Sequence, residues 1–276
     1  MYQGFFINLD RNETRRRSLA KHLEEIGAAS RYRRIEAVDG RAVAPHYQTE
    51  LDPGSLGCWL SHVKTAEANR GAKNHLHIIE DDTIFGRNVV NMFDGLLESA
   101  DAKLSGWDLI FTDLYLVPGD ARTFRELSGR MRQYQQSKTR GLLDLQHASF
   151  SAMSSYFVNS QSIDRFIRLV SGRETAGVPI DLYVRGLVNQ KLLKAYLTVP
   201  FLTSISSDSL QSDIRGEMEL SRAVFDTFRR SFFQDADVHE LAVEMRKLIE
   251  GIAPSPLEMI YLDALLFTLS DRYVHF

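Results

Sequence analysis

The sequence is short of several features, and each shortage excludes a class of protein. Its 276 residues include one cysteine, Cys58, so no disulfide can form within the chain and no metal site can rest on several cysteines. No apolar run approaches the ~20 residues that a membrane-spanning helix needs. The formal net charge is only -3, so no excess of positive charge favours nucleic acid as a partner. We expect a cytoplasmic protein, with peripheral contact to the inner membrane left open.

What is present suits a globular protein with a substantial core, since 44% of the residues are hydrophobic. The N-terminal stretch "MYQGFFINLDRNETRRR" places its basic residues after a short apolar run. A signal peptide has the opposite order and a longer apolar region. We therefore expect the chain to begin directly with an element of the fold.

The first forty residues have the pattern of a strand, a helix and a second strand. The stretch "GFFINLD" predicts a short buried strand, and "RYRRIEAVDG" predicts another. Between them, Leu19, Leu23 and Ile26 have helical spacing, with Asn12 as a plausible N-cap and Gly27 as a stop. This order indicates a βαβ unit and a mostly parallel sheet.

The rest of the chain divides into an alternating region and a helical tail. Residues 118–146 are polar and rich in arginine without a clear period, and we expect an irregular excursion there. The sequence predicts an α/β domain over residues 1–216 and a helical C-terminal appendage over 217–276, which could form a homodimer, contact an acceptor or cover the sheet. Helices are expected at 55–71, 89–104, 162–172 and 178–193, and strands at 74–85, 106–117, 154–160 and 194–206.

Three adjacent acids follow the apolar run in "NHLHIIEDDTIF". Glu80, Asp81 and Asp82 would lie at the carboxyl edge of a parallel sheet, where open α/β sheets bind their ligands. Oxygen-rich acidic sites suit hard divalent cations such as Mg²⁺ or Mn²⁺, which can neutralise a departing diphosphate. The alternative interpretation is a solvated strand end with one aspartate capping a turn.

Other polar residues would reach the same edge. Asn8, Asp10 and Arg11 close the first strand, and Arg15 follows in the first turns of the helix. Such side chains can bind the polar groups and phosphates of a nucleotide, or they can cap the helix and face solvent. His62 stands on an otherwise apolar helix, where a histidine is more often a hydrogen-bonded packing residue than a ligand.

Two further acids are candidates for a general base. Asp113 comes just after the strand residues "WDLIF", so it is a second acid at the sheet edge. Asp181 stands near the start of a predicted helix, where a carboxylate can also simply stabilise the helix N-terminus.

Taken in order, these segments resemble glycosyltransferase family 25, the bacterial lipooligosaccharide galactosyltransferases and the collagen galactosyltransferases. The resemblance covers about residues 4–215 and rests on "INLDRNETRR", "AVDG", "GSLGCWLSH", "HIIEDDTIF" and "VPIDLYVRG". It implies a GT-A-type fold, a Rossmann-like α/β sandwich that binds a nucleotide sugar at the sheet edge.

The resemblance also implies roles for the site residues. The three acids look like a variant of the DxD metal motif, with Asp82 as the main ligand of Mn²⁺ or Mg²⁺ and Glu80 and Asp81 as support or as contacts to the ribose or sugar. Asp181 matches the family's "pxD" segment and is our first choice for the general base, and Asp113 is the second. Contacts to the nucleotide or its diphosphate are expected from Asn8, Asp10, Arg11 and Arg15.

The expected function is therefore an inverting, metal-dependent glycosyltransferase. It would move a hexose, for example from UDP-galactose, to a saccharide or glycolipid acceptor in lipopolysaccharide or other surface glycan synthesis. Two alternatives stay open: a non-catalytic protein that binds nucleotide sugars or saccharides, and another metal-dependent enzyme that acts on nucleotide sugars. A nucleotidyltransferase usually carries a glycine-rich loop after its first strand, and the sequence shows none.

Overall fold

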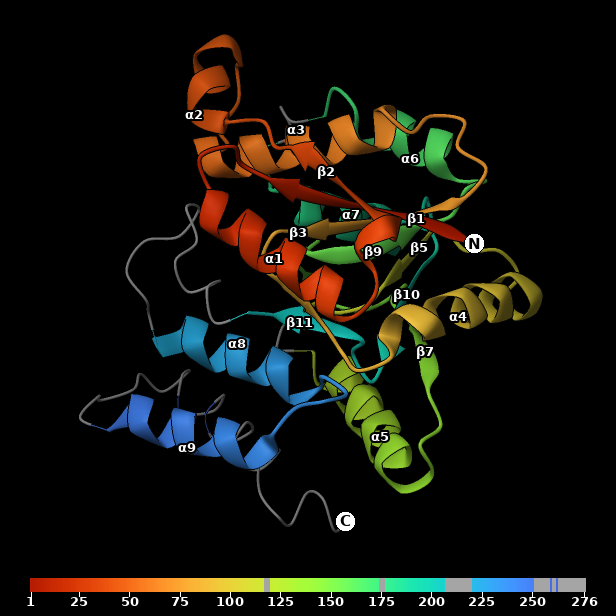
Figure 1. Cartoon of the computed structure of the whole chain (residues 1–276), viewed down its shortest axis with the longest axis vertical. Coiled ribbons are helices and arrows are strands. Elements are labelled where there is room, and N and C mark those ends of the chain that lie inside the picture. The colour runs from red at the N-terminus through yellow and green to blue at the C-terminus, as the bar shows by residue number, and fades with distance from the viewer. Residues whose placement is uncertain (117–119, 174–176, 207–219, 251–258, 260–261, 263–276) are drawn as a thin grey trace.

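A seven-stranded sheet forms the centre of the molecule (Figure 1). The computed structural model describes residues 1–116, 120–173, 177–206, 220–250, 259 and 262. The strand order is β2-β1-β3-β9-β5-β10-β7. Five of these strands run in one direction, whereas β9 and β7 are antiparallel to their neighbours. The mixed α/β class and the mostly parallel sheet predicted from the sequence are confirmed.

The elements alternate along the chain as the sequence predicts. The order β1, α1, β2, with β1 and β2 parallel, is the expected βαβ unit. The strands of the main sheet are β1 (Tyr2–Asn8), β2 (Tyr32–Glu36), β3 (His75–Glu80), β5 (Leu109–Phe111), β7 (Gly141–Asp144), β9 (Ser155–Val158) and β10 (Ala195–Val199). Two small sheets pair β4 (Thr83–Phe85) with β11 (Thr203–Ile205), and β6 (Tyr115–Leu116) with β8 (Phe150–Ser151). The α-helices are α1 (Glu13–Glu25), α2 (Gly40–Val43), α3 (Pro53–Glu67), α4 (Val89–Lys103), α5 (Ala121–Ser137), α6 (Ile163–Val170), α7 (Ile180–Asn189), α8 (Leu220–Ser231) and α9 (Val238–Ile249).

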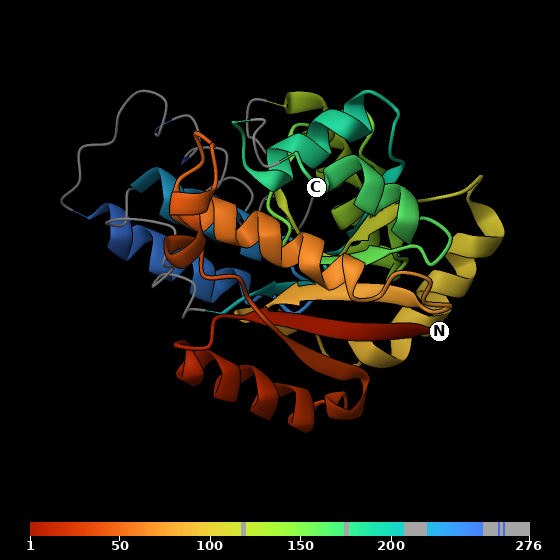
Figure 2. The same cartoon turned by 90° about the horizontal axis from the view of Figure 1, so that it is seen from above.

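Helices cover both faces of the sheet (Figure 2). Helices α3, α6 and α7 lie on one face, and α1 and α4 lie on the other. Strand β3 contributes to both cores, because successive residues of a strand point to opposite faces. Its Leu76 and Ile78 belong to the core on the α3 side, and Ile79 belongs to the core on the α1 side. A strand covered on both faces is apolar almost throughout, which explains the run before the three acids.

The arginine-rich region is regular, which corrects the expectation of an irregular excursion over residues 118–146. Most of it forms α5, and β7 follows at the edge of the sheet. Asp120 caps α5 by accepting a hydrogen bond from the Thr123 backbone N–H at 3.0 Å. Leu127 and Met131, one helical turn apart, are buried in the core. Arginines spread along the rest of α5 weaken the helical period of its apolar residues.

The sheet register brings distant parts of the chain to one edge. Ile7 of β1 pairs with Glu80 of β3, so the residues that follow, Asn8 and Asp81, are neighbours. Because β9 is antiparallel to β3, it is the start of β9 that reaches this edge. The Glu80 backbone N–H accordingly donates to the Ser154 carbonyl at 2.8 Å. Polar residues from three strands therefore meet at one place.

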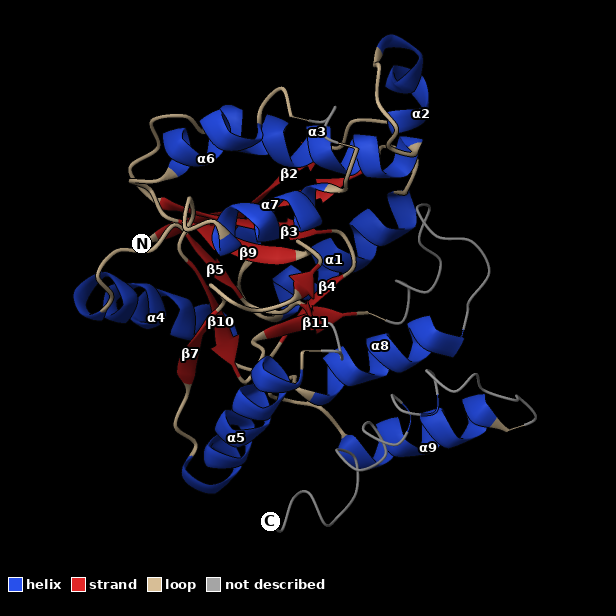
Figure 3. Ribbon diagram, turned by 180° about the vertical axis from the view of Figure 1, so that it is seen from behind, coloured by secondary structure: helices blue, strands red, loops and turns tan. Residues whose placement is uncertain are grey.

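Helices α8 and α9 lie side by side below the sheet (Figure 3). Phe228 of α8 and Phe232 just after it, with Leu241 and Met245 of α9, belong to the same core as Trp59 of α3. The proposed domain boundary at 216/217 lies outside the described residues, so the division into a domain and an appendage stays a prediction. None of the described helices is long and apolar enough to cross a membrane.

Candidate active site

Two cavities open at the sheet edge where the three acids lie. The first has a volume of ≈ 130 Å³ and lies beside the ends of β1 and β3 and the starts of α1 and α3. The second has a volume of ≈ 360 Å³ and lies between β6, α7 and α8. Cys58, Glu80 and Asp82 line both cavities, so the cavities meet at these three residues.

The two cavities differ in their polar residues. The first is rich in arginine, and its charged and hydrogen-bonding lining residues are Arg11, Asn12, Arg15, Asp39, Arg41, Ser61, His62, Glu80, Asp81 and Asp82. The second has as many acids but one arginine and one aromatic hydroxyl, and its corresponding lining residues are Ser55, Glu80, Asp82, Tyr115, Ser151, Ser154, Asp181, Asp226 and Arg229.

Asp81 is held by the protein through both of its carboxylate oxygens. Asn8 Nδ2 donates to Asp81 Oδ2 at 2.6 Å, and Arg15 Nη1 lies 3.0 Å from Asp81 Oδ1. Arg34 Nε in turn donates to Asn8 Oδ1 at 3.0 Å. Burial raises the pKa of Asp81, and the Arg15 guanidinium opposes that shift. Asn8 does not line the first cavity, and it instead fixes the position of Asp81.

Asp82 retains an oxygen for a ligand. Its Oδ2 lies 3.2 Å from Arg15 Nη2, whereas its Oδ1 is buried without a hydrogen-bond partner among the described residues. Burial and the neighbouring Glu80 carboxylate raise the pKa of Asp82 to about 7. A buried acceptor without a partner costs about 1–3 kcal/mol, which a bound cation would recover. The chemistry of Asp82 Oδ1, with the Glu80 carboxylate as a neighbour, suits a hard divalent cation.

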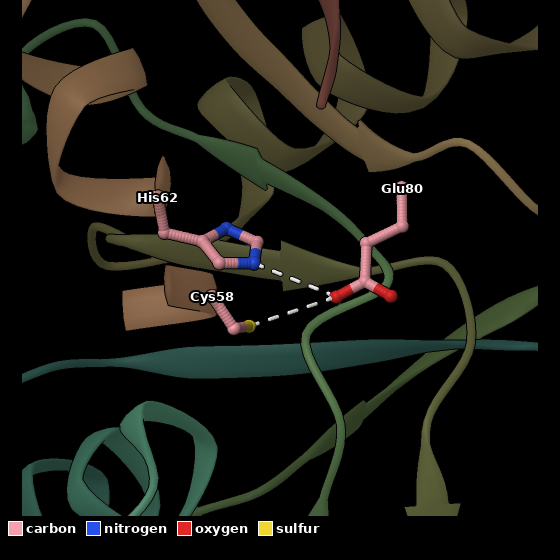
Figure 4. Close-up of side chains that lie close together, drawn as sticks. All are labelled: Cys58, His62 and Glu80. Carbon is pink, nitrogen blue, oxygen red and sulfur yellow. Dashed lines mark hydrogen bonds and ion pairs between the residues drawn. The ribbon is translucent and has the colours of Figure 1, made fainter. Parts of the chain in front are cut away.

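Glu80 also faces two side chains of α3 (Figure 4). Its Oε1 lies 3.6 Å from His62 Nε2 and 4.0 Å from Cys58 Sγ. The other ring nitrogen, His62 Nδ1, lies 2.9 Å from the Tyr156 hydroxyl. His62 is a buried, hydrogen-bonded residue, as the sequence suggests, and it also contributes to the wall of the first cavity.

Asp113 is enclosed by protein partners. Arg229 Nε donates to Asp113 Oδ2 at 3.1 Å, and Arg229 Nη2 contacts both this oxygen and Ser154 Oγ. Ser154 Oγ donates to Asp113 Oδ1 at 3.1 Å. Burial raises the pKa of Asp113, and the Arg229 charge opposes that shift. Asp113 is not among the residues that line either cavity.

Asp181, the other candidate base, lines the second cavity. Its Oδ2 accepts a hydrogen bond from the Ala152 backbone N–H at 2.8 Å, and its Oδ1 accepts one from the Leu182 N–H at 2.9 Å. Ala152 has a φ of 75°, a left-handed conformation that costs a non-glycine residue free energy. These contacts fix the orientation of the carboxylate toward the cavity wall formed by the loop before β9.

Of the two candidates just after β1, Arg11 lies in the first cavity and Asp10 does not. Arg11 pairs with Asp39, and both line the first cavity. Asp10 has 71% of its side chain exposed, pairs with Arg34 at 3.0 Å, and does not line that cavity.

Helix α8 supplies residues that sequence reasoning missed. Arg229 and Asp226 both line the second cavity, and the Arg229 guanidinium lies 4.9 Å from the centre of the Tyr115 ring. Burial raises the pKa of Asp226 to about 6, although Arg229 and Arg230 oppose the shift. The only signal in the sequence is the spacing of three between Asp226 and Arg229, which places both on one helical face.

Known proteins match the part of the chain that carries most of this site. The model of glycosyltransferase family 25 (LPS biosynthesis protein) matches residues 1–184. The chain is 31% identical to the probable inactive glycosyltransferase 25 family member 3 of Bos taurus over 126 aligned positions, which cover 39% of the chain and 21% of that protein. It is 30% identical to procollagen galactosyltransferase 1 of Danio rerio over 126 positions, covering 39% of the chain and 20% of that protein. The match thus spans about a fifth of the length of these curated relatives.

Proposed function

Because the chain belongs to glycosyltransferase family 25, we propose that it transfers a hexose from a UDP-sugar to a saccharide acceptor with the help of a divalent cation. The observation that carries this proposal is the meeting of two cavities at Glu80 and Asp82. A transferase must hold a donor and an acceptor with their reacting atoms in contact. Two cavities of different chemistry that share a wall of carboxylates meet this requirement.

We assign the donor to the first cavity. This cavity is lined by Arg11, Arg15 and Arg41, together with Asp39. One arginine guanidinium can bind two oxygens of a phosphate at once. The cavity lies at the carboxyl ends of the parallel strands β1 and β3, the usual place for a nucleotide in an α/β fold. This placement supports the GT-A-type fold that the sequence predicts.

Asp82 and Glu80 would hold Mn²⁺ or Mg²⁺, which when bound stabilises negative charge on the departing diphosphate. Arg15 pairs with both Asp81 and Asp82, so its positive charge would also lie beside the departing diphosphate. Asp81 holds Arg15 through an ion pair at 3.0 Å, and Asn8 fixes its other oxygen. We therefore propose that Asp82 matters for donor binding and Asp81 for the position of Arg15.

We assign the acceptor to the second cavity and propose Asp181 as the general base. The acceptor hydroxyl gives its proton to Asp181 while its oxygen forms a bond to the anomeric carbon, and the bond from that carbon to the UDP oxygen breaks. A single displacement of this kind inverts the configuration. Each Asp181 oxygen accepts one backbone N–H and keeps a second lone pair for the hydroxyl proton.

Galactose is the first donor sugar to test. One relative is named a procollagen galactosyltransferase, and the family description refers to LPS biosynthesis. We accordingly propose UDP-galactose as the donor and a surface saccharide or glycolipid as the acceptor.

A non-catalytic role in binding nucleotide sugars is the second candidate. It is favoured by one specific observation, the names of two relatives: a probable inactive member of Bos taurus and an inactive member of Homo sapiens. Such a protein would bind a UDP-sugar without turning it over.

Kinetics of Asp181→Asn test the proposed mechanism. We expect kcat to fall by about 10²–10⁴, because the hydroxyl loses its proton acceptor, while donor affinity measured by calorimetry stays within about twofold. Asp226→Asn is the matched control, since it neutralises another carboxylate of the same cavity. An unchanged kcat in Asp181→Asn refutes the choice of base. Donor binding by the wild type without turnover on any donor and acceptor supports the binding protein instead.

A further inference from the structure

Cys58, His62 and Glu80 form a compact group at the junction of the two cavities (Figure 4). Cys58 and His62 are four residues apart on α3, so they lie on the same face one turn apart. Both point toward the same oxygen of Glu80. The sulfur, the nitrogen and the oxygen all lie within 4.8 Å of one another.

These separations are close to those of a zinc site. With Zn–S near 2.3 Å and Zn–N and Zn–O near 2.0–2.1 Å, neighbouring ligand atoms of a tetrahedron lie roughly 3.3–3.6 Å apart. The observed distances are 3.6 Å from His62 Nε2 to Glu80 Oε1 and 4.0 Å from Cys58 Sγ to the same oxygen. The third separation, from Cys58 Sγ to His62 Nε2, is within 4.8 Å, so side-chain movements of up to about an ångström would bring all three atoms onto one ion.

We propose that Cys58, His62 and Glu80 bind Zn²⁺, with the fourth coordination position open to the cavities. A thiolate, an imidazole and a carboxylate form a borderline-soft ligand set that suits Zn²⁺ or Co²⁺ better than Mg²⁺ or Mn²⁺. The Cys58 thiol gives up its proton to solvent when the metal binds.

A second layer of contacts supports the group. His62 is 1% exposed, and its Nδ1 lies 2.9 Å from the hydroxyl of Tyr156, which is 0% exposed. For Nε2 to bind a metal, Nδ1 must carry the ring proton and donate it to the Tyr156 hydroxyl oxygen. A hydrogen bond on the far ring nitrogen is the usual way in which proteins orient a metal-binding histidine. Here it directs Nε2 toward Glu80.

The site would compete with glycosyl transfer, a consequence that rests on the proposed function. Glu80 belongs both to this group and to the hard-cation pair with Asp82, and both Glu80 and Cys58 line both cavities. Zn²⁺ at the group would draw Glu80 away from Asp82 and occupy the junction between donor and acceptor. We therefore infer that Zn²⁺ inhibits the transfer reaction that Mn²⁺ or Mg²⁺ supports.

Titration of the full chain with Co²⁺, a spectroscopic substitute for Zn²⁺, tests the binding site without any activity assay. We expect one equivalent of Co²⁺ to produce a thiolate-to-cobalt charge-transfer band and the strong visible bands of four-coordinate cobalt, and Zn²⁺ to displace it. Because Cys58 is the one cysteine of the chain, a thiolate band identifies this residue as the ligand.

Variants separate this site from its neighbours. Cys58→Ser should abolish the thiolate band, and Glu80→Gln should weaken Co²⁺ binding by at least about tenfold. Asp82→Asn, which leaves all three proposed zinc ligands in place, and His46→Ala, which alters an exposed histidine, should keep the band. Thermal melts establish that each variant is folded. Absence of a thiolate band in the wild type, or equal affinity in Glu80→Gln, overturns the proposal.

An inhibition assay tests separately whether Zn²⁺ at this group blocks glycosyl transfer. We expect Zn²⁺ to inhibit wild-type transfer, and Cys58→Ser to need at least about tenfold more Zn²⁺ for the same fractional inhibition. A cobalt spectrum of the expected form together with transfer that Zn²⁺ does not affect keeps the site and overturns its inhibitory role. If the chain transfers no sugar at all, the proposed function fails, and the cobalt spectrum still decides the metal site.

Discussion

Arg229 and Asp113 are both almost fully buried, and each is a charge partner of the other. Removing a charge from water costs several kcal/mol, so a buried pair is tolerated only when its hydrogen bonds are satisfied. Asp113 accepts bonds on both oxygens, from Arg229 and from Ser154. The aspartate therefore holds the guanidinium beside the second cavity.

Loss of Arg229 should be costly for stability. Arg229→Ala leaves the buried Asp113 carboxylate uncompensated, and we expect the free energy of unfolding to fall by about 3–5 kcal/mol. Urea denaturation measures this change. Arg230→Ala is the matched control on the next position of α8, where the pair with Glu244 is partly exposed and worth less than about 1 kcal/mol. Equal losses in the two variants would contradict the stabilising role of the Arg229 pair.

Asp81 and Asp82 should respond differently to the same change. Asp82→Asn should lose the Mn²⁺-dependent thermal shift given by a UDP-sugar. Its Tm without ligand should change less than that of Asp81→Asn, because removal of the buried charge with the unpartnered Oδ1 offsets the lost pair with Arg15. Asp81→Asn should lower the Tm, because it breaks the ion pair with Arg15 and disturbs the bond from Asn8. Thermal-shift assays with and without Mn²⁺ measure both effects. A full metal-dependent shift in Asp82→Asn would refute its role as a ligand.

The proximity of Asn8 to Asp81 could be predicted from the sequence, and that of Arg229 to Asp113 could not. Strands that follow one another in a βαβ pattern end at the same sheet edge, so polar residues at their ends must converge. Arg229 lies 116 residues beyond Asp113, and its position depends on how α8 packs against the sheet. No local pattern contains that information.

At the scale of elements, α8 connects the core to the second cavity. Its Phe228 packs in the main core, as does Phe232 just after the helix, and α8 carries Asp226 and Arg229 to the cavity. Burial raises the pKa of Asp226 on this helix from 3.8 to about 6. The stability of the protein should therefore depend on pH through this residue.

The stability contributed by Asp226 should fall as the pH rises. Its folded-state pKa is above its unfolded value, so between about pH 4 and pH 6 the folded protein binds more protons than the unfolded chain. The contribution is fully present below about pH 4 and lost above about pH 6, a change of at most about 3 kcal/mol. In Asp226→Asn this part of the pH dependence should disappear.

Urea denaturation of both proteins across this range measures the difference. The free energy of unfolding of Asp226→Asn minus that of the wild type should rise with pH and level off above about pH 6. A difference that is constant from about pH 4 to pH 7 would show that Asp226 has an ordinary pKa.

Element type was more predictable than element direction or extent. The apolar stretch at 154–160 predicts a strand, and β9 is one, but nothing in its pattern reveals that it runs antiparallel to β3 and β5. The error over residues 118–146 has another cause. In α5 the buried Leu127 and Met131 have the right spacing, but arginine side chains surround them, so the apolar period is weak.

At the scale of the whole molecule, the two cavities and their junction are the main feature that could not be predicted from the sequence. The motifs predict which residues gather at the sheet edge, since Arg11, Arg15 and the three acids all line the first cavity. The second cavity requires the loop before β9, α7 and α8 to come together. Their arrangement follows from tertiary packing, which a motif does not encode.

The central claim is that a hexose passes from a UDP-sugar to a saccharide at this junction. Release of UDP from a panel of UDP-hexoses, with saccharide acceptors and with or without Mn²⁺, measures it most directly in the wild type and in Asp82→Asn. We predict Mn²⁺-dependent release with at least one donor, faster when an acceptor is present, and its loss in Asp82→Asn. Release that is independent of the metal, or equal in Asp82→Asn, would contradict this assignment.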